Sequence, residues 1–115
     1  MVAWKPFGRQ DAFMPFENHH GNRSFTISSI WKNAPPASGV YGLSNSREWL
    51  YIGETENIQA DLLHHLDHPD AFLVESGPSG FTYELDPAER RVSRQQQLIA
   101  ELDPRGNRRS DRAPR

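Results

Sequence analysis

The sequence contains no cysteine, and this absence excludes disulfide bonds, zinc sites built from thiolates and a catalytic thiol. It also lacks an apolar run close to the ~18 residues that a membrane-spanning helix needs. No hydrophobic stretch of signal-peptide length follows the first methionine. We therefore expect a cytoplasmic chain that has no membrane partner.

Strongly apolar residues are scarce. Val, Ile, Leu and Phe together number 24 of the 115 residues, about 21 %, which lies just above the level typical of disordered chains. A chain of this length and composition can bury one modest core, so we expect a single small domain.

The apolar residues divide the sequence into three segments. Residues 36–104 hold 17 of the 24 and are expected to form the domain. Residues 1–35 combine isolated aromatic rings with polar residues, which indicates an irregular aromatic arm and one short helix. Residues 105–115 contain five Arg and one Asp, so we expect a disordered basic tail. Without this tail, 8 basic and 14 acidic residues remain, and the body is acidic.

Three β-rich runs predict the strands of a small sheet. Residues 40–43 and 49–52 flank the polar segment 44–48, a pattern typical of a hairpin with a longer loop. Residues 81–85 form a third run after a Gly-Pro-Ser-Gly turn.

Helical periodicity fills the remaining segments. Apolar residues recur at helical spacing over residues 27–34, and a second helix is expected to begin after Asn57 and to end before Pro69. A third helix follows Asp86, whose carboxylate is expected to cap it. The order ββαβα predicts an α/β sandwich with a three-stranded sheet flanked by helices.

Two tripeptides mark the predicted hairpin, Gly39–Tyr41 (Gly-Val-Tyr) and Tyr51–Gly53 (Tyr-Ile-Gly), separated by nine residues. The later segment Gln95–Ile99 is followed by Pro104 and Asn107. This combination resembles the GIY-YIG endonuclease superfamily, and the later spacing is similar to that of its nucleotide-excision-repair nucleases. The resemblance implies the small GIY-YIG nuclease fold for residues 36–104.

The resemblance also implies roles for individual residues. In the family, the two tyrosines at the positions of Tyr41 and Tyr51 flank the scissile phosphate and help to deprotonate water. His65 occupies the position of a family histidine. Asp61, however, stands where the family has an arginine, and Gln95 stands where it has a metal-binding glutamate. By this resemblance the chain is a degenerate member that lacks both charged catalytic groups.

The two replacements argue against catalysis. A carboxylate ~4 Å from a phosphate oxygen, at an effective dielectric of ~20, turns about 4 kcal/mol of attraction into a similar repulsion. Gln95 carries no charge with which to hold a hard cation. The segment from residue 54 to residue 75 also contains six acids and no Lys or Arg. These acids are Glu54, Glu56, Asp61, Asp67, Asp70 and Glu75.

The favoured hypothesis is therefore a catalytically inactive binding or scaffold module. It would bind an unknown protein or small ligand and would need no cofactor. Gly53 and Asn107 are its expected ligand-binding positions. One alternative is a divergent endonuclease that depends on a divalent metal such as magnesium, with Arg91 or Arg94 as its cation. The other is an accessory protein that binds nucleic acid weakly through the Arg-rich tail.

Three further groups of residues are candidates for a role. Asp61, His64, His65 and His68 are spaced to share one side of a helix, where they would form either a metal site or, as we expect, an acidic solvent face without metal. Alternatively, Asp61 forms an ion pair with Arg91 or Arg94. The remaining candidates are expected to be a polar loop, His19 and His20, and core or rim aromatic residues, Trp31 and Trp49.

Overall fold

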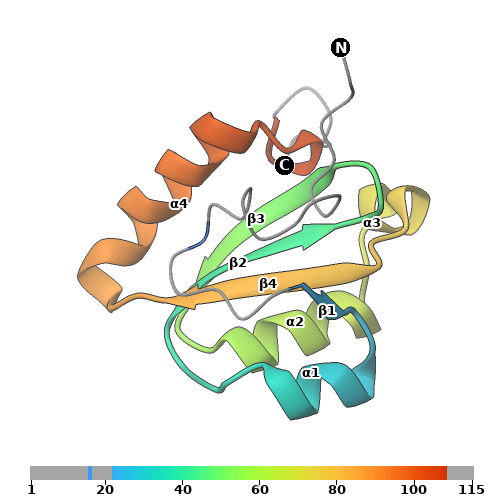
Figure 1. The fold of residues 1–115 in the computed structure, drawn as a ribbon, viewed down its shortest axis with the longest axis horizontal. Coiled ribbons are helices and arrows are strands. Elements are labelled where there is room, and N and C mark those ends of the chain that lie inside the picture. Colours follow the sequence, from blue (N-terminus) through green and yellow to red (C-terminus); the bar gives the residue numbers. More distant parts are fainter. Residues whose placement is uncertain (1–15, 17–21, 109–115) are drawn as a thin grey trace.

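A four-stranded antiparallel sheet forms the centre of the molecule (Figure 1). The computed structural model describes residue 16 and residues 22–108. The strands are β1 (Arg23–Ser24), β2 (Gly39–Ser44), β3 (Trp49–Thr55) and β4 (Gly80–Leu85), in the order β1-β4-β2-β3. The helices are α1 (Ile27–Asn33), α2 (Ile58–Asp67), α3 (Ala71–Ser76), α4 (Ala88–Leu102) and the 3-10 helix η2 (Arg105–Asn107).

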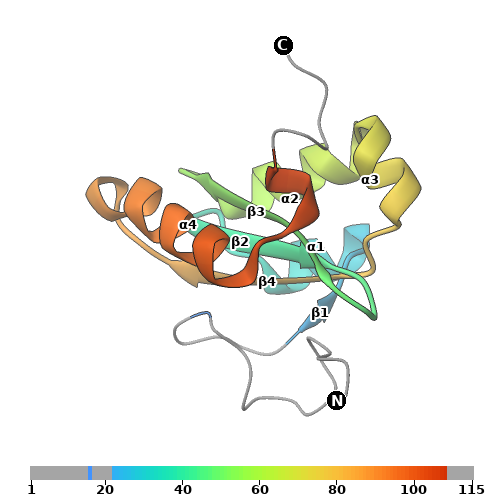
Figure 2. The same ribbon diagram turned by 90° about the horizontal axis from the view of Figure 1, so that it is seen from above.

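The sheet separates two hydrophobic cores because successive side chains of a strand point to opposite faces. Tyr41 and Leu43 of β2 pack with Leu62 of α2 in the larger core. Val40 of β2 packs with Leu98 of α4 in the smaller one. Figure 2 shows the same division, with α4 on one side of the sheet and α1 and α2 on the other.

Most of the predicted elements are confirmed. The hairpin of β2 and β3 pairs Tyr41 with Gly53, and β4 pairs with the other edge of β2. The Asn57 side chain accepts a hydrogen bond from the backbone N–H of Ala60 and so caps α2, as expected. None of the helices in the described residues is long and apolar enough to cross a membrane.

The predicted three-stranded sheet is corrected to four strands. The additional strand β1 has only two residues, with Arg23 paired to Phe81, and is too short to show a periodic pattern. The short helix α3 was also not predicted. The Asp70 side chain caps it, and Gly77 ends it in the left-handed conformation.

The start of α4 also differs from the prediction. Pro87, not Asp86, is the N-cap residue, and no side chain caps this helix. The Asp86 side chain is instead buried, while its backbone N–H donates to the Ser38 carbonyl.

The predicted basic tail begins too early at residue 105. Gly106 is buried in η2, where an added Cβ would lie 2.4 Å from the Leu50 carbonyl oxygen. Arg105 pairs with Glu48 at 3.1 Å and stacks on the Phe72 ring. Packing that depends on Gly106 and on these distant partners orders the segment, so the domain extends to residue 108.

The rest of the tail, residues 109–115, lies outside the described residues. So do residues 1–15 and 17–21 of the predicted arm, including His19 and His20. Phe16 is described: its ring is buried against Trp49, with ring centres 5.5 Å apart, and above Gly42. This contact agrees with the expected packing of aromatic rings on the domain and places Trp49 in the core.

Candidate functional site

The first of the predicted site residues, Tyr41, closely approaches Gly53 on the neighbouring strand. Tyr41 is only 1 % exposed. An added Cβ on Gly53 would lie 2.5 Å from both Cζ and the hydroxyl oxygen of Tyr41, which is too close for any side chain. Gly53, which was expected to bind ligand, is therefore needed to make room for the Tyr41 ring.

The Tyr41 hydroxyl joins two side chains of α2. It donates to Oδ2 of Asp61 at 2.7 Å and lies 2.7 Å from Nε2 of His65. Asp61 and His65 can both reach it because residues four apart share one side of a helix. Because the hydroxyl hydrogen points toward Asp61, the hydroxyl oxygen can accept a hydrogen bond from His65 when Nε2 carries the imidazole proton.

The surroundings of Tyr41 keep its hydroxyl protonated. Burial is the largest cause, followed by the negative charge of Asp61 and by Tyr51, and together they raise the pKa of Tyr41 far above its ordinary value. The hydroxyl is thus a hydrogen-bond donor at neutral pH.

Tyr51 completes an aromatic group at this end of the hairpin. Its ring centre lies 6.2 Å from that of Tyr41 and 5.5 Å from that of His65, with an edge-on arrangement to the imidazole. The structure therefore brings together four of the predicted site residues: Tyr41, Tyr51, Asp61 and His65.

Gln95 and Asn107 meet elsewhere, at the outer edge of β3. Both side-chain amides donate to the carbonyl oxygen of Ile52, at 3.1 Å from Gln95 and 3.0 Å from Asn107. The Asn107 side chain also accepts from the Ile52 N–H at 2.8 Å. It thus occupies both hydrogen-bonding groups of one strand residue, which gives Asn107 a structural role, while its expected ligand-binding role stays a prediction.

Arg91 and Arg94 of α4 pair with other acids, whereas one alternative expected one of them to pair with Asp61. Arg91 donates to Glu54 at 2.8 Å, and Arg94 forms two hydrogen bonds with the buried Glu84, at 2.6 and 3.0 Å. Glu84 pairs with Val40 across the strands and faces α4. Asp61 belongs to the opposite face of the sheet, so these arginines lie with the sheet between them and Asp61.

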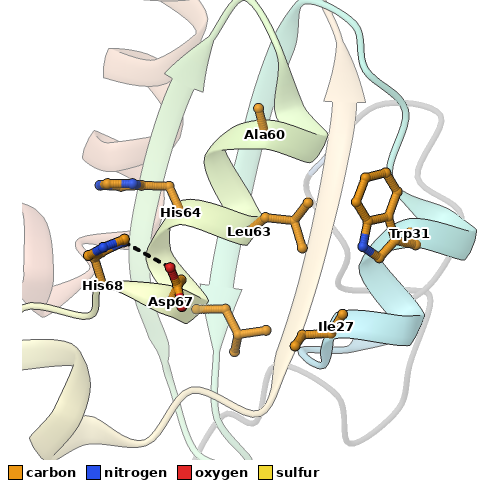
Figure 3. Close-up of a pocket in the computed structure, with 8 residues that line it drawn as sticks. Ile27, Trp31, Ala60, Leu63, His64, Asp67 and His68 are labelled. Carbon is orange, nitrogen blue, oxygen red and sulfur yellow. Dashed lines mark ion pairs between the residues drawn. The ribbon is translucent and has the colours of Figure 1, made fainter.

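The histidines of α2 point to different sides. His65 faces Tyr41, whereas the His64 and His68 rings stack on each other with centres 4.9 Å apart (Figure 3). Nδ1 of His68 lies 3.3 Å from Oδ2 of Asp67. The four residues proposed as one metal-binding side therefore do not converge. Within residues 22–108 no group of three or more His, Cys, Asp or Glu side chains is arranged to hold a metal ion.

A buried acidic pair beside α4 was missed by sequence reasoning. Glu84 and Asp86 are two residues apart and both buried. Burial, together with the hydrogen bond and charge of Glu84, raises the pKa of Asp86 to about 7. The alternation of Phe81, Tyr83 and Leu85 could have placed Glu84 on the other face, but its partner Arg94 could not be chosen without the packing of α4.

Comparison with solved structures finds a similar fold in the GIY-YIG N-terminal endonuclease domain of UvrC from Thermotoga maritima. A point mutant bound to its catalytic divalent cation superposes with a TM-score of 0.62 and 20 % identity, covering 72 % of this chain and 96 % of that chain. The form bound to magnesium gives 0.60 and 22 %, with 71 % and 96 % covered. No protein-family model and no curated protein sequence matches the chain. The chain has the fold of the GIY-YIG endonuclease domain.

Proposed function

We propose that the chain is a binding or scaffold module with a nuclease fold that does not hydrolyse phosphodiester bonds. The observation that supports this most directly is the pairing of the Tyr41 hydroxyl with Asp61 and His65. By the resemblance, a phosphate would lie beside this hydroxyl and a guanidinium would stand at position 61.

The charge beside Tyr41 has the wrong sign for this chemistry. Phosphodiester hydrolysis builds negative charge on the phosphate oxygens and needs a cation there. A carboxylate at the position of Asp61 would change the interaction by several kcal/mol, which corresponds to several orders of magnitude in rate. Arg94 cannot supply the cation cheaply, because leaving Glu84 buried without its partner costs about 3–5 kcal/mol.

The residues present do not fit the divalent cation of the nuclease fold. Magnesium requires several oxygen ligands in octahedral geometry and is held in proteins by carboxylates. The Gln95 amide carries no charge and donates to Ile52. Among the carboxylates, Glu54 is paired with Arg91, and Asp61 accepts from Tyr41.

Tyr41 is also unsuited to activate water. A general base works best when its pKa lies near the working pH. Burial and the charge of Asp61 move the pKa of Tyr41 in the opposite direction. The same contacts that exclude it as a base join β2 to α2, so this tyrosine has a structural reason to be present.

Nucleic-acid binding through the tail is the weaker alternative. Arg105 and Arg108 pair with Glu48 and Asp103, so three of the five tail arginines lie beyond residue 108. Fewer cations give fewer phosphate contacts, and binding is therefore weaker and has a shallower salt dependence.

A plasmid-nicking assay tests the proposal. The full chain and the UvrC domain of T. maritima are incubated with supercoiled plasmid and either magnesium or manganese. We expect nicking by the UvrC domain and none by this chain at the same concentration. Metal-dependent nicking by this chain would support the divergent-endonuclease alternative instead.

A further inference from the structure

A groove of about 430 Å³ lies between α1 and α2 (Figure 3). Its walls are mostly apolar and include Ile27, Trp31, Leu63 and Leu66. Asp67 and His68 line its polar end. We call this feature the α1–α2 groove.

Two large apolar side chains of α1 stand exposed at this groove. Ile27 is 61 % exposed and Trp31 is 60 % exposed, while Ile30 of the same helix is fully buried in the core. Contiguous exposed apolar groups rimmed by polar ones mark interaction surfaces, and Trp is the residue most enriched among the groups that dominate binding energy. The α1–α2 groove is therefore a surface that a partner would cover.

The edges of the sheet offer less to a partner. At the β3 edge, the backbone groups of Ile52 are occupied by Asn107 and Gln95. At the other edge, β1 has only two residues. Addition of a strand needs a row of unpaired backbone groups, so in the described part of the chain these edges favour it little.

The charges beside the groove favour a second copy of the chain over a strongly basic or acidic partner. Lys32 is exposed next to Trp31 on α1, and Asp67 is exposed on α2. A partner of one sign would meet a like charge on one helix. In a two-fold pair of copies, α1 of one copy lies over α2 of the other, and Lys32 meets the opposite Asp67 twice.

We propose that the α1–α2 groove is the contact surface of a two-fold symmetric dimer in which Trp31 of each copy packs against the groove of the other. The contact is small, because a ten-residue helix such as α2 is only about 15 Å long. Small interfaces give weak and reversible association. We therefore expect the dimer to form only when the protein concentration is in the high micromolar range.

Sedimentation equilibrium of the full chain over a concentration series tests the association. The mass is expected to rise from 13.2 kDa toward twice that value. Trp31→Ser and Ile27→Ser should each leave the chain monomeric, and both positions are exposed, so circular dichroism is expected to show unchanged folding. Val92→Ser is the matched control, since Val92 is 52 % exposed on α4, and it should associate like the parent chain.

A charge exchange tests the two-fold arrangement. Lys32→Glu and Asp67→Lys should each weaken association, by about tenfold at low ionic strength, because each places like charges opposite one another twice. An equal mixture of the two variants should restore it, since every contact in the mixed dimer joins opposite charges. A monomer at every concentration, a dimer insensitive to both groove variants, or a mixture no tighter than its components would overturn the proposal.

Discussion

The Tyr41 hydroxyl donates a hydrogen bond to Oδ2 of Asp61 across 2.7 Å, and this contact joins the central strand β2 to helix α2. Tyr41 is buried, so its hydroxyl needs partners within the protein. Asp61 and His65 supply them from a single side of α2. The residues at the positions that the resemblance marks as catalytic thus connect the sheet to helix α2 in this chain.

The first prediction concerns this connection. Asp61→Ala should lower the free energy of unfolding by about 1.5–3 kcal/mol, the range for a hydrogen bond to a charged group. Tyr41→Phe should make the Asp61 substitution nearly neutral, because the shared bond is already absent. Urea denaturation of both single variants and the double variant measures the coupling.

Asp67→Ala is the control, because Asp67 is exposed on the same helix and its loss should change stability by less than about 0.5 kcal/mol. Equal costs at positions 61 and 67 would contradict the assigned role of Asp61.

A second prediction concerns the β3 edge. Asn107→Ala should cost about 1–3 kcal/mol, because the Ile52 N–H loses its acceptor and the Ile52 carbonyl loses one of two donors. Hydrogen exchange at the Ile52 amide should become faster in the same variant. Deletion of residues 109–115 serves as the control and should leave both quantities unchanged. An unaltered exchange rate in Asn107→Ala would show that its amide does not protect the strand.

The buried ion pair of α4 leads to a third prediction. Arg94 and Glu84 have side chains only 7 % and 1 % exposed, so Glu84→Gln should destabilise by about 3–5 kcal/mol by leaving Arg94 without a charged partner. Replacing both residues by Met should cost less than Glu84→Gln alone. Thermal unfolding of the exposed-pair control, Arg108→Ala, should match the parent chain. The prediction fails if Glu84→Gln behaves like that control.

The fourth prediction is a pH dependence at Asp86. Its pKa is about 7 in the folded chain against 3.8 without these surroundings, so the folded state binds the proton more tightly. The stabilising contribution of the protonated carboxyl is fully present below pH 4 and declines as the pH rises toward 7. Asp86→Asn removes this decline, so its melting temperature should exceed that of the parent chain by about 10–20 °C at pH 8 and by little at pH 4. A constant difference across this range would contradict the assignment.

Local signals explain which parts of the fold could be predicted. The hairpin and α2 followed from alternation, from the Asn57 cap and from Pro69, all of which act within a few residues. The convergence of Asp61 and His65 followed from their spacing of four on a helix. These features need no knowledge of distant parts of the chain.

The missed features depend on contacts that are distant in sequence or on elements too short for periodicity. Strand β1 has two residues, and η2 is ordered by contacts such as that of Asn107 with Ile52, which is 55 residues away. The partner of Arg94 depends on which face of the sheet α4 covers. The exposure of Trp31 likewise reflects how α1 sits beside α2, which its amphipathic pattern did not fix.

Single-turnover nicking of supercoiled plasmid, compared between the parent chain and Tyr51→Phe in manganese buffer, tests the central claim most directly. The account predicts the same background rate for both proteins and for buffer alone, because a carboxylate stands beside the Tyr41 hydroxyl and no carboxylate stands at position 95. Nicking that the parent chain performs and Tyr51→Phe abolishes would show a working active site and contradict the account.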